Sequence, residues 1–484
     1  MSKVLSFLKN KVSVEPVGFL FFITIIFSSS LSTNLLLYKA CDPSGTINNR
    51  VGARCDRETE VQHLVAPING WKGMVNQIVP TVLTLFAGTW SDLHGRRRRP
   101  LIMGPIIGQI ISDTVSVYCT LHWSLSPWLT AVFQVIPQAF SGGAPLMFIG
   151  IFAYVADTST EEWRTVKFGM VTCVIFVGGI LGMLIYGYAV VLMGFQYAYL
   201  LSISMGISTL ILASMFIKDT AVEYHKQPFI RDIMNTMNPM TVFRSCWQVM
   251  SKARDRHVTL VLWLTIFFCA PLATVPLEGE VSITYLFFRN KFHWNEVDFS
   301  IFNAFQMAII LGGSIFSLSI LSHKLKLNDA LIGLIASVFD LMASIGFFLA
   351  NEQWQVLLVP PLEMFRGAGL AITGSIASKC VDSDELGSMN SIKLLVESSV
   401  KGAFLPIYNT VYNKTLETMP SAFFLISSLL TFPLVFLFSA VYLLTRTPNY
   451  SASREELTKT NYPRTNYILD VKPINDGDIV DKKY

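Results

Sequence analysis

The sequence predicts an all-α membrane protein whose twelve or so transmembrane helices form two six-helix bundles. Of its 484 residues, 52% are hydrophobic and only 14% are charged, and the mean hydropathy is +0.49. Apolar runs of about 20 residues, long enough for a spanning helix, recur along the chain. Because lipid offers no partners for backbone hydrogen bonds, such runs predict helices. The short alternating segments that are typical of membrane β-barrels do not occur in the sequence.

The spans fall into two sets, one on each side of a polar stretch. The first six are expected at residues 17–39, 70–91, 100–121, 126–156, 167–191 and 195–217, and the second six at 258–288, 298–321, 329–350, 354–379, 387–410 and 420–445. This layout predicts an N-terminal bundle at 1–217, a cytoplasmic linker at 218–257, a C-terminal bundle at 258–446 and a cytoplasmic tail at 447–484.

Basic residues gather in the loops on one side of this arrangement. They are Lys3, Lys9 and Lys11, Arg96 to Arg99, Arg164 and Lys167, Lys252, Arg254 and Arg256, and Lys324 and Lys326. The positive-inside rule predicts that this side is cytoplasmic, so both termini are expected in the cytoplasm. The sequence leaves open whether the membrane is the plasma membrane or a lysosomal or endosomal membrane.

The turn between the second and third spans carries the most specific motif. It reads Gly88-Thr-Trp-Ser-Asp92-Leu-His-Gly95-Arg96-Arg97-Arg98-Arg99. The spacing of Gly, Asp, Gly and Arg-Arg resembles the signature loop of the major facilitator superfamily, which lies between spans 2 and 3. The resemblance implies the major facilitator fold, in which two bundles rock about a central site.

We interpret this loop as a conformational latch. Its residues are Gly88, Asp92, Gly95, Arg96, Arg97 and, at the end of span 4, Asp157. The glycines allow a close helix approach and a tight turn, and the arginines can pair with acids at nearby helix ends. The other interpretation is that the charges only fix the topology, and for Arg98 and Arg99 this interpretation is favoured.

Two carboxylates lie within the seventh span, where ionisable groups are costly and therefore indicate a function. They are Glu278 and Glu280, with Pro271, Pro276 and Gly279 nearby. Proline and glycine allow a broken segment in which both carboxylates face a cavity. The alternative is that the span ends near residue 277 and both glutamates lie in an outer vestibule.

Other charges are expected at membrane depth. Glu363 and Arg366 are spaced to share one helix face, which predicts a structural pair whose charges neutralise each other; both are also candidate proton or substrate groups. Lys393 and Glu397 belong to a charged stripe of span 11 that cannot face lipid. Asp113 and Asp340 have no partner visible in the sequence, and a structural or a transport role is equally open for each.

These charges suggest a coupling mechanism. A desolvated carboxyl group can take up and release a proton near neutral pH, and Glu278, Glu280 and Glu397 are the best candidates. Arg366 and Lys393 are the candidate groups for an anionic substrate. No cofactor other than a coupling proton is expected, and no metal site.

The first long loop contains two cysteines, Cys41 and Cys55, on the side predicted to be non-cytoplasmic and oxidising. We expect a pair between them as readily as free thiols or a more distant pairing. Asn413 begins an Asn-x-Thr sequon in the loop between spans 11 and 12, where glycosylation is possible.

Within the superfamily, the chain resembles the proton-coupled folate transporter family, solute carrier family 46. The resemblance rests on the Gly88–Arg97 motif, on Phe152-Ala-Tyr-Val-Ala-Asp157-Thr-Ser, and on Gly387 after an acidic turn. The folate-transporting branch carries an acidic residue, a histidine and an arginine where this chain has Val174, Pro276 and Gly374. The resemblance therefore implies membership of the family with an organic anion other than folate as substrate.

Together these observations predict a secondary transporter of a small organic anion that works in the lipid bilayer by alternating access. A transport-deficient sensor or scaffold of the same fold is the alternative, but no partner motif is visible in the linker or tail. An enzyme is not expected, since no nucleophile or metal-ligand constellation appears, and an ATP-driven pump would need a phosphate-binding loop that the sequence lacks. Neither a nucleic acid nor an obligate protein partner is expected.

Overall fold

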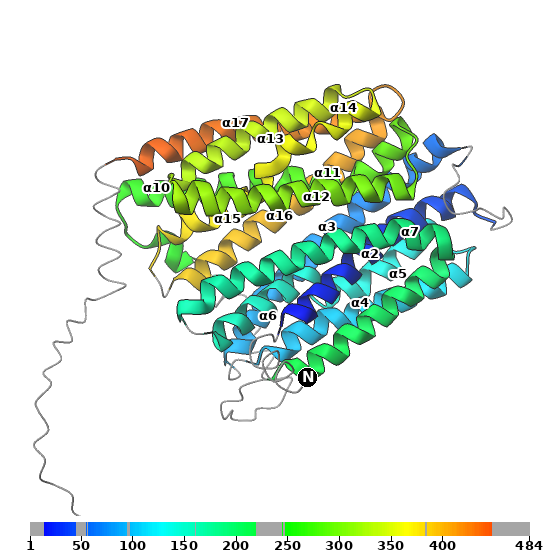
Figure 1. Cartoon of the computed structure of the whole chain (residues 1–484), viewed down its shortest axis with the longest axis horizontal. Helices are drawn as coiled ribbons and strands as arrows, with labels where there is room; N and C mark the ends of the chain where they lie inside the picture. Colours follow the sequence, from blue (N-terminus) through cyan, green and yellow to red (C-terminus); the bar gives the residue numbers. More distant parts are fainter. Residues whose placement is uncertain are drawn as a thin grey trace, which may run out of the picture.

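The computed structural model describes residues 14–44, 55, 57–93, 97–159, 161–218, 244, 247–382 and 385–447. Most of the predicted linker and nearly all of the predicted tail lie outside the described residues. Figure 1 shows long helices that lie roughly along one direction, with α2 to α7 in the lower part of the view and α10 to α17 in the upper part. We call these two groups the first half and the second half.

The regular elements of the described residues are helices, as predicted. The first half contains α2 (Glu15–Cys41), α3 (Glu58–Leu93), α4 (Arg99–Leu121), α5 (Pro127–Phe140), α6 (Gly143–Thr158) and α7 (Glu161–Phe216). The second half contains α10 (Arg256–Leu264), η1 (Thr265–Cys269), α11 (Ala270–Lys291), α12 (Glu296–Phe316), η2 (Ser317–Lys324), α13 (Asp329–Leu349), α14 (Gln353–Leu357), η3 (Pro360–Phe365), α15 (Arg366–Ser378), α16 (Leu386–Thr415), η4 (Pro420–Ala422) and α17 (Phe423–Thr445).

The prediction of an all-α membrane protein is confirmed. Nine helices in the described residues are long and apolar enough to cross a membrane. One of them, Lys167–Phe216, contains two predicted spans that meet at Gly194, where φ is 74° and the backbone leaves the helix. The helices α3 and α16, which are less apolar, cover the two remaining predicted spans. The arrangement is consistent with twelve spans.

Several predicted spans differ in their interior. The span expected at 126–156 is divided into α5 and α6 by a turn at residues 141–142. The predicted break beside Pro276 and Gly279 is wrong, because α11 is helical from Ala270 to Lys291. The irregular backbone of this predicted span lies earlier in the sequence, in the π-helical turn η1, which directly precedes α11. Such π-turns are frequent at functional sites.

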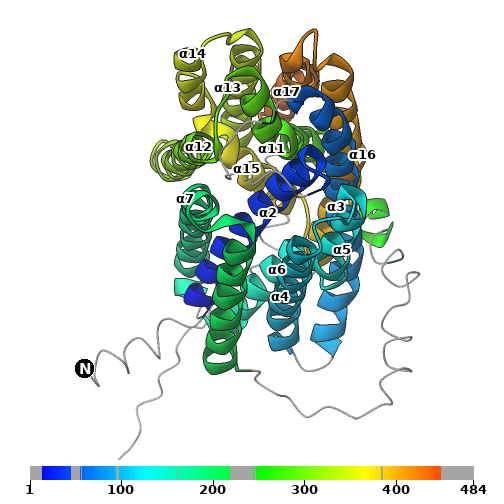
Figure 2. The same cartoon turned by 90° about the vertical axis from the view of Figure 1, so that its right-hand side faces the viewer.

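The two halves pack through α3 against α16 and through α7 against α12 (Figure 2). One buried core, which includes Phe27, Tyr186 and Phe288, draws residues from both halves, while two other cores each belong to one half. Gly187 of α7 lies so close to Ser300 of α12 that an added Cβ would overlap the Ser300 side chain. Small residues of this kind allow membrane helices to approach closely.

Candidate functional site

A cavity of about 420 Å³ lies between the two halves. This volume is within the range of small-molecule sites. Its charged lining residues are Lys72 from the first half and Glu278, Glu280 and Arg366 from the second. The remaining lining combines amides and hydroxyls with aromatic and aliphatic side chains. The cavity therefore collects several of the ionisable groups that the sequence singled out.

Arg366, the first residue of α15, lies at the centre of a buried ion cluster. Its Nη1 donates to Glu280 Oε2 (2.7 Å) and Glu363 Oε1 (2.6 Å), and its Nε donates to Asp340 Oδ1 (2.5 Å). The side chains of these four residues are at most 8% exposed. Arg366 therefore joins α11, α13 and η3, a much wider role than the single pair with Glu363 that its spacing suggested.

The cluster holds more negative than positive charge. Three carboxylates face one guanidinium, and Gln306 adds only a neutral hydrogen bond to Glu363. Uncompensated charge is expensive to bury, and the described residues alone do not balance the charge of this cluster. The Arg366 Nη2 has no hydrogen-bond partner among the described residues, although it is buried. Arg366 is itself one of the residues that line the cavity.

Glu278 and Glu280 point to different partners. Glu280 is bound to Arg366, whereas Glu278 is 36% exposed and its Oε1 lies 3.9 Å from Lys401 Nζ. Both line the cavity. The alternative prediction, an outer vestibule beyond a span that ends near residue 277, is wrong because α11 continues to Lys291.

The other predicted charges lie away from the lining. Lys393 and Glu397 pair with each other along α16 (2.9 Å) and do not line the cavity. Asp113 is fully buried in the first half and accepts hydrogen bonds from Ser28, Gln109 (2.9 Å) and Ser202 (2.7 Å). Hydrogen bonds from neutral groups, rather than a cation, therefore satisfy this acid.

Lys72 of α3 is a cavity residue that the sequence did not single out. Its side chain is half-buried, and its Nζ donates a hydrogen bond to the Ser32 Oγ. It falls near the start of the span predicted at 70–91, where a lysine would be expected at the membrane boundary. Only the length of α3, which begins at Glu58, shows that Lys72 lies deeper.

The sequence also gave no sign of a second ion network, which joins the halves. Arg289 of α11 donates to Glu58 of α3 (2.7 Å) and to Glu296 of α12 (2.8 Å), and all three are buried. Tyr38 and Asn34 of α2 also bind the Glu296 carboxylate, at 3.1 and 3.3 Å. In the sequence these charges lie at or beyond the ends of spans, where they resemble ordinary loop charges.

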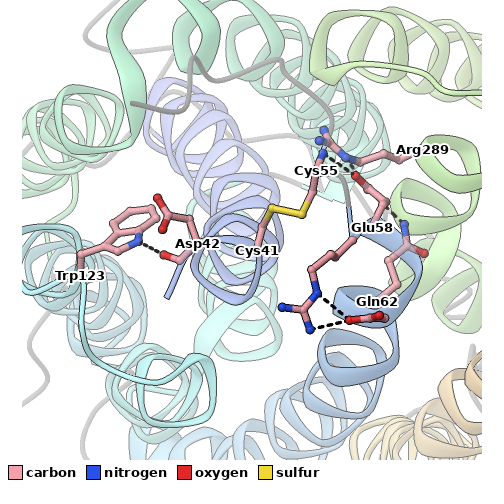
Figure 3. The surroundings of a disulfide bond; sticks show 9 residues. Cys41, Asp42, Cys55, Glu58, Gln62, Trp123 and Arg289 are labelled. Atoms are coloured by element: carbon pink, nitrogen blue, oxygen red, sulfur yellow. Dashed lines mark hydrogen bonds and ion pairs between the residues drawn. A yellow bond between two sulfur atoms is a disulfide. The ribbon is translucent and has the colours of Figure 1, made fainter. Parts of the chain in front are cut away.

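The same end of the molecule carries a disulfide between Cys41 and Cys55, so we call it the disulfide end. Figure 3 shows the bond between the end of α2 and the start of α3, with Glu58 and Arg289 nearby. Trp123 donates to the Asp42 carbonyl (2.6 Å) beside it. Asn413 also lies at this end, where its Oδ1 is 2.5 Å from His63 Nδ1. The predicted glycosylation of Asn413 stays a prediction.

The opposite end, which we call the arginine end, carries the signature loop. Arg98 forms an ion pair with Asp157 (2.8 Å) and a hydrogen bond to Ser91 (3.0 Å). Arg98 is therefore paired with the acid that was expected to serve the latch, and the interpretation that it only fixes the topology stays a prediction. Arg97 is exposed, and the latch role of Gly88, Asp92, Gly95, Arg96 and Arg97 stays a prediction. Gly95, Arg96 and the side chain of Asp92 lie outside the described residues.

A second charge cluster at the arginine end joins the last part of the predicted linker to the second half. Lys252 binds Asp382 (2.6 Å) and Glu385 (2.7 Å), and Arg254 binds Glu385 (2.5 Å). The hydrogen bonds that Lys252 donates to Asp382 and Glu385 raise its pKa. Partial burial opposes the ionisation of Glu385, but the hydrogen bonds from Lys252 and Arg254 outweigh it and lower the Glu385 pKa.

Comparison with known proteins finds transporters. The family model of the Major Facilitator Superfamily matches residues 17–406. Among curated proteins, the chain is 23% identical to a probable peptidoglycan muropeptide transporter of Drosophila melanogaster, with 86% of this chain and 83% of the relative covered. It is 22% identical to the proton-coupled folate transporter of Rattus norvegicus (87% and 89% covered). It is also 22% identical to a lysosomal proton-coupled steroid conjugate and bile acid symporter of Gallus gallus (87% and 92% covered).

Solved structures give the same fold. The chain is similar to a peptide transporter in complex with sulfate, with a TM-score of 0.63 and 12% sequence identity over 89% of this chain and 96% of that one. At this identity the likeness shows the fold alone. The curated relatives are members of solute carrier family 46, as the sequence motifs predicted.

Proposed function

The chain belongs to the major facilitator superfamily and is a secondary transporter, and on this premise we propose that it carries an organic anion through the central cavity together with protons. The observation that carries this proposal is the Arg366 cluster, where three carboxylates surround one guanidinium beside the cavity.

An anionic substrate is supported by the free donor of Arg366. A buried guanidinium N–H without a partner loses the hydrogen bond that it had in water, and a carboxylate, sulfate or phosphate oxygen would restore it. The Arg366 Nη2 is such a group, and Arg366 lines the cavity. Arg366 is therefore one of the two cations, with Lys72, that can attract an anion into the cavity.

Proton coupling is supported by charge balance. If all of Glu280, Asp340 and Glu363 are ionised, the cluster already carries excess negative charge, and an arriving anion is repelled. A proton on one carboxyl group removes part of this charge and frees the guanidinium for the anion. Proton and anion would then bind together, which is the requirement for symport.

Alternating access is supported by the way the two halves meet. The ion network of Arg289, Glu58 and Glu296 joins them at the disulfide end, so we propose that the structure is closed there and that substrate leaves toward the arginine end. We further propose that the disulfide end faces the extracellular or lumenal side, because disulfides persist in oxidising compartments. Both termini would then lie in the cytoplasm.

The proposal is tested by uptake into proteoliposomes with an acidic or a neutral exterior. The labelled solutes are a bile acid, a steroid sulfate, a folate and a muropeptide, the classes that the relatives' names suggest. We expect an inward proton gradient to drive accumulation of at least one of them. Uptake of none above the level of empty liposomes, at either pH, would contradict the proposal.

A variant separates coupling from binding. Glu363→Gln keeps the size of the side chain but removes a carboxylate that touches Arg366. We expect this variant to exchange substrate across the membrane in the absence of a gradient but to lose accumulation driven by protons. Glu352→Gln, on an exposed residue at the start of α14, is the matched control. If Glu363→Gln still accumulates substrate as the wild type does, this part of the proposal fails.

A further inference from the structure

Lys72, which lines the cavity from the first half, has no assigned role. We propose that Lys72 binds the negative group of the transported anion, while Arg366 serves mainly to couple the anion to protons. This inference rests on the proposed function, because it names the group that recognises the substrate of that cavity.

The surroundings of Lys72 leave its charge unmatched. Its Nζ donates to the Ser32 Oγ, and Ser32 in turn donates to the Gln134 side chain. Both partners are neutral. No carboxylate of the described residues lies within ion-pair distance of Lys72. An ammonium group has three donors, so two remain for a ligand in the cavity that Lys72 lines.

Arg366 lies in the opposite electrostatic environment. Its guanidinium already binds three carboxylates, and while these are ionised their combined negative charge outweighs the attraction of the guanidinium for an approaching anion. The first-half wall around Lys72 offers the amides and hydroxyls of Asn69, Asn76, Gln77, Ser29, Ser30 and Thr33 instead, none of them charged. An anion therefore finds its uncompensated cation on the first half.

The cavity lining from the second half indicates the chemistry of the rest of the substrate. Aromatic side chains of the second half line the cavity and contact one another, namely Tyr285, Phe288, Phe299, Phe347 and Phe424. Such a wall binds rings and aliphatic bodies through apolar contact and leaves polar orientation to a few groups. The fitting substrate is amphipathic, with its anionic group toward Lys72 and an apolar body toward the aromatic wall.

The test compares Lys72→Gln and Lys72→Arg with the wild type. The probe is taurocholate, and an uncharged alcohol analogue of the same steroid serves as the matched ligand. Binding to the purified protein is measured by thermal shift. Initial uptake rates are measured separately in proteoliposomes. We expect Lys72→Gln to raise the Kd and KM for taurocholate about tenfold or more, as for the loss of a charge-assisted hydrogen bond. Binding of the uncharged analogue should change little, and Lys72→Arg should restore much of the affinity.

The control is Lys291→Gln, which removes the same charge from a lysine that binds the Ala350 carbonyl outside the cavity. Its Kd and KM should equal those of the wild type. Three results would overturn the inference: equal taurocholate affinity in Lys72→Gln and wild type, an equal loss for the charged and uncharged ligands, or a larger loss in Lys393→Gln than in Lys72→Gln. If no anion of the uptake panel binds or enters with the wild type, the proposed function itself fails and this inference with it.

Discussion

The two ends of the molecule are held together in different ways. At the disulfide end, a buried ion network of Arg289, Glu58 and Glu296 connects the first half to the second. At the arginine end, the ion pairs between described residues do not cross from one half to the other: Arg98 pairs with Asp157 in the first half, and Lys252, in the predicted linker, pairs with Glu385 of the second. The same kind of interaction thus joins the halves at one end and stiffens each half separately at the other.

This difference assigns separate tasks to the two sets of charges. Pairs within a half persist whichever way the halves rock, so they preserve the shape of each bundle. In the alternating access that we propose, a network between the halves must break for the disulfide end to open, so it would set the balance between the closed and open conformations.

The largest effect is expected from the removal of Arg289, which connects the two halves at the disulfide end. Arg289→Ala leaves two buried carboxylates without their cation, which costs about 3–5 kcal/mol and destabilises the closed end. A cysteine placed at Thr33, which lines the cavity, reports opening through labelling by a membrane-impermeant maleimide added at the disulfide end. We expect labelling to accelerate at least tenfold and transport to fall strongly.

The matched control for Arg289 is Arg57, in the same region. Arg57 pairs with Glu60, but the two side chains are 75% and 66% exposed, and exposed pairs contribute little. In the protein that carries the reporter cysteine at Thr33, Arg57→Ala should leave the maleimide labelling rate and the transport rate unchanged. Equal effects of the two substitutions would remove the distinction between a gate and an ordinary surface pair.

The disulfide is a link within the first half at the disulfide end. We therefore expect it to stabilise that half without joining the two halves. Cys41 and Cys55 are 14 residues apart in the sequence, and a cross-link over such a loop contributes about 3 kcal/mol. Reduction, or the double substitution Cys41→Ser with Cys55→Ser, should lower the melting temperature by several degrees. Cys173→Ser, on a cysteine outside the disulfide, should melt like the wild type. An unchanged melting temperature after reduction would show that this link does not stabilise the protein.

At the arginine end, Arg98→Ala should act on one half only. The pair of Arg98 with Asp157 is largely buried, and its loss should cost about 1–3 kcal/mol of stability. The expected results are a lower melting temperature and unchanged maleimide labelling at the disulfide end. The double exchange Arg98→Asp with Asp157→Arg should recover part of the stability. Faster labelling in Arg98→Ala would contradict the separation of tasks.

The smallest effect is expected for the cluster of Lys252, Arg254 and Glu385. Its hydrogen bonds lower the Glu385 pKa below the ordinary value of 4.5. Stability from this carboxylate is therefore fully present above that ordinary value and is lost as the pH falls through the lowered pKa. The melting temperature of the wild type should exceed that of Glu385→Gln by a small margin at neutral pH, and the margin should shrink on acidification. If the difference in melting temperature between the wild type and Glu385→Gln grew as the pH fell, the predicted direction of the pH dependence would be wrong.

The fold was predictable because its main signal is local. An apolar run such as 17–39 indicates its own span, and α2 indeed covers Glu15–Cys41. The breaks between helices were harder to predict. The turn that divides α5 from α6 lies inside one apolar run, and whether α11 stays helical through Pro276 depends on the helices packed against it. Backbone breaks at proline are decided by packing as much as by the residue itself.

The candidate site was predictable only residue by residue. Charge at membrane depth singled out Glu280, Glu363, Asp340 and Arg366, but they come from four elements, and only the packing of those elements shows that one guanidinium serves three acids. Lys72 and Arg289 were missed for a different reason. Both lie near predicted span boundaries, where a basic residue is common and carries no functional signal.

The central claim, that protons and an organic anion cross together through the Arg366 cavity, is tested most directly by following protons during substrate entry. Proteoliposomes that contain a pH-sensitive dye receive taurocholate from outside, with equal pH on both sides and the membrane potential clamped. The account predicts that the lumen acidifies as taurocholate enters, and that Glu363→Gln abolishes the acidification. Taurocholate entry without any change of lumenal pH in the wild type would contradict it.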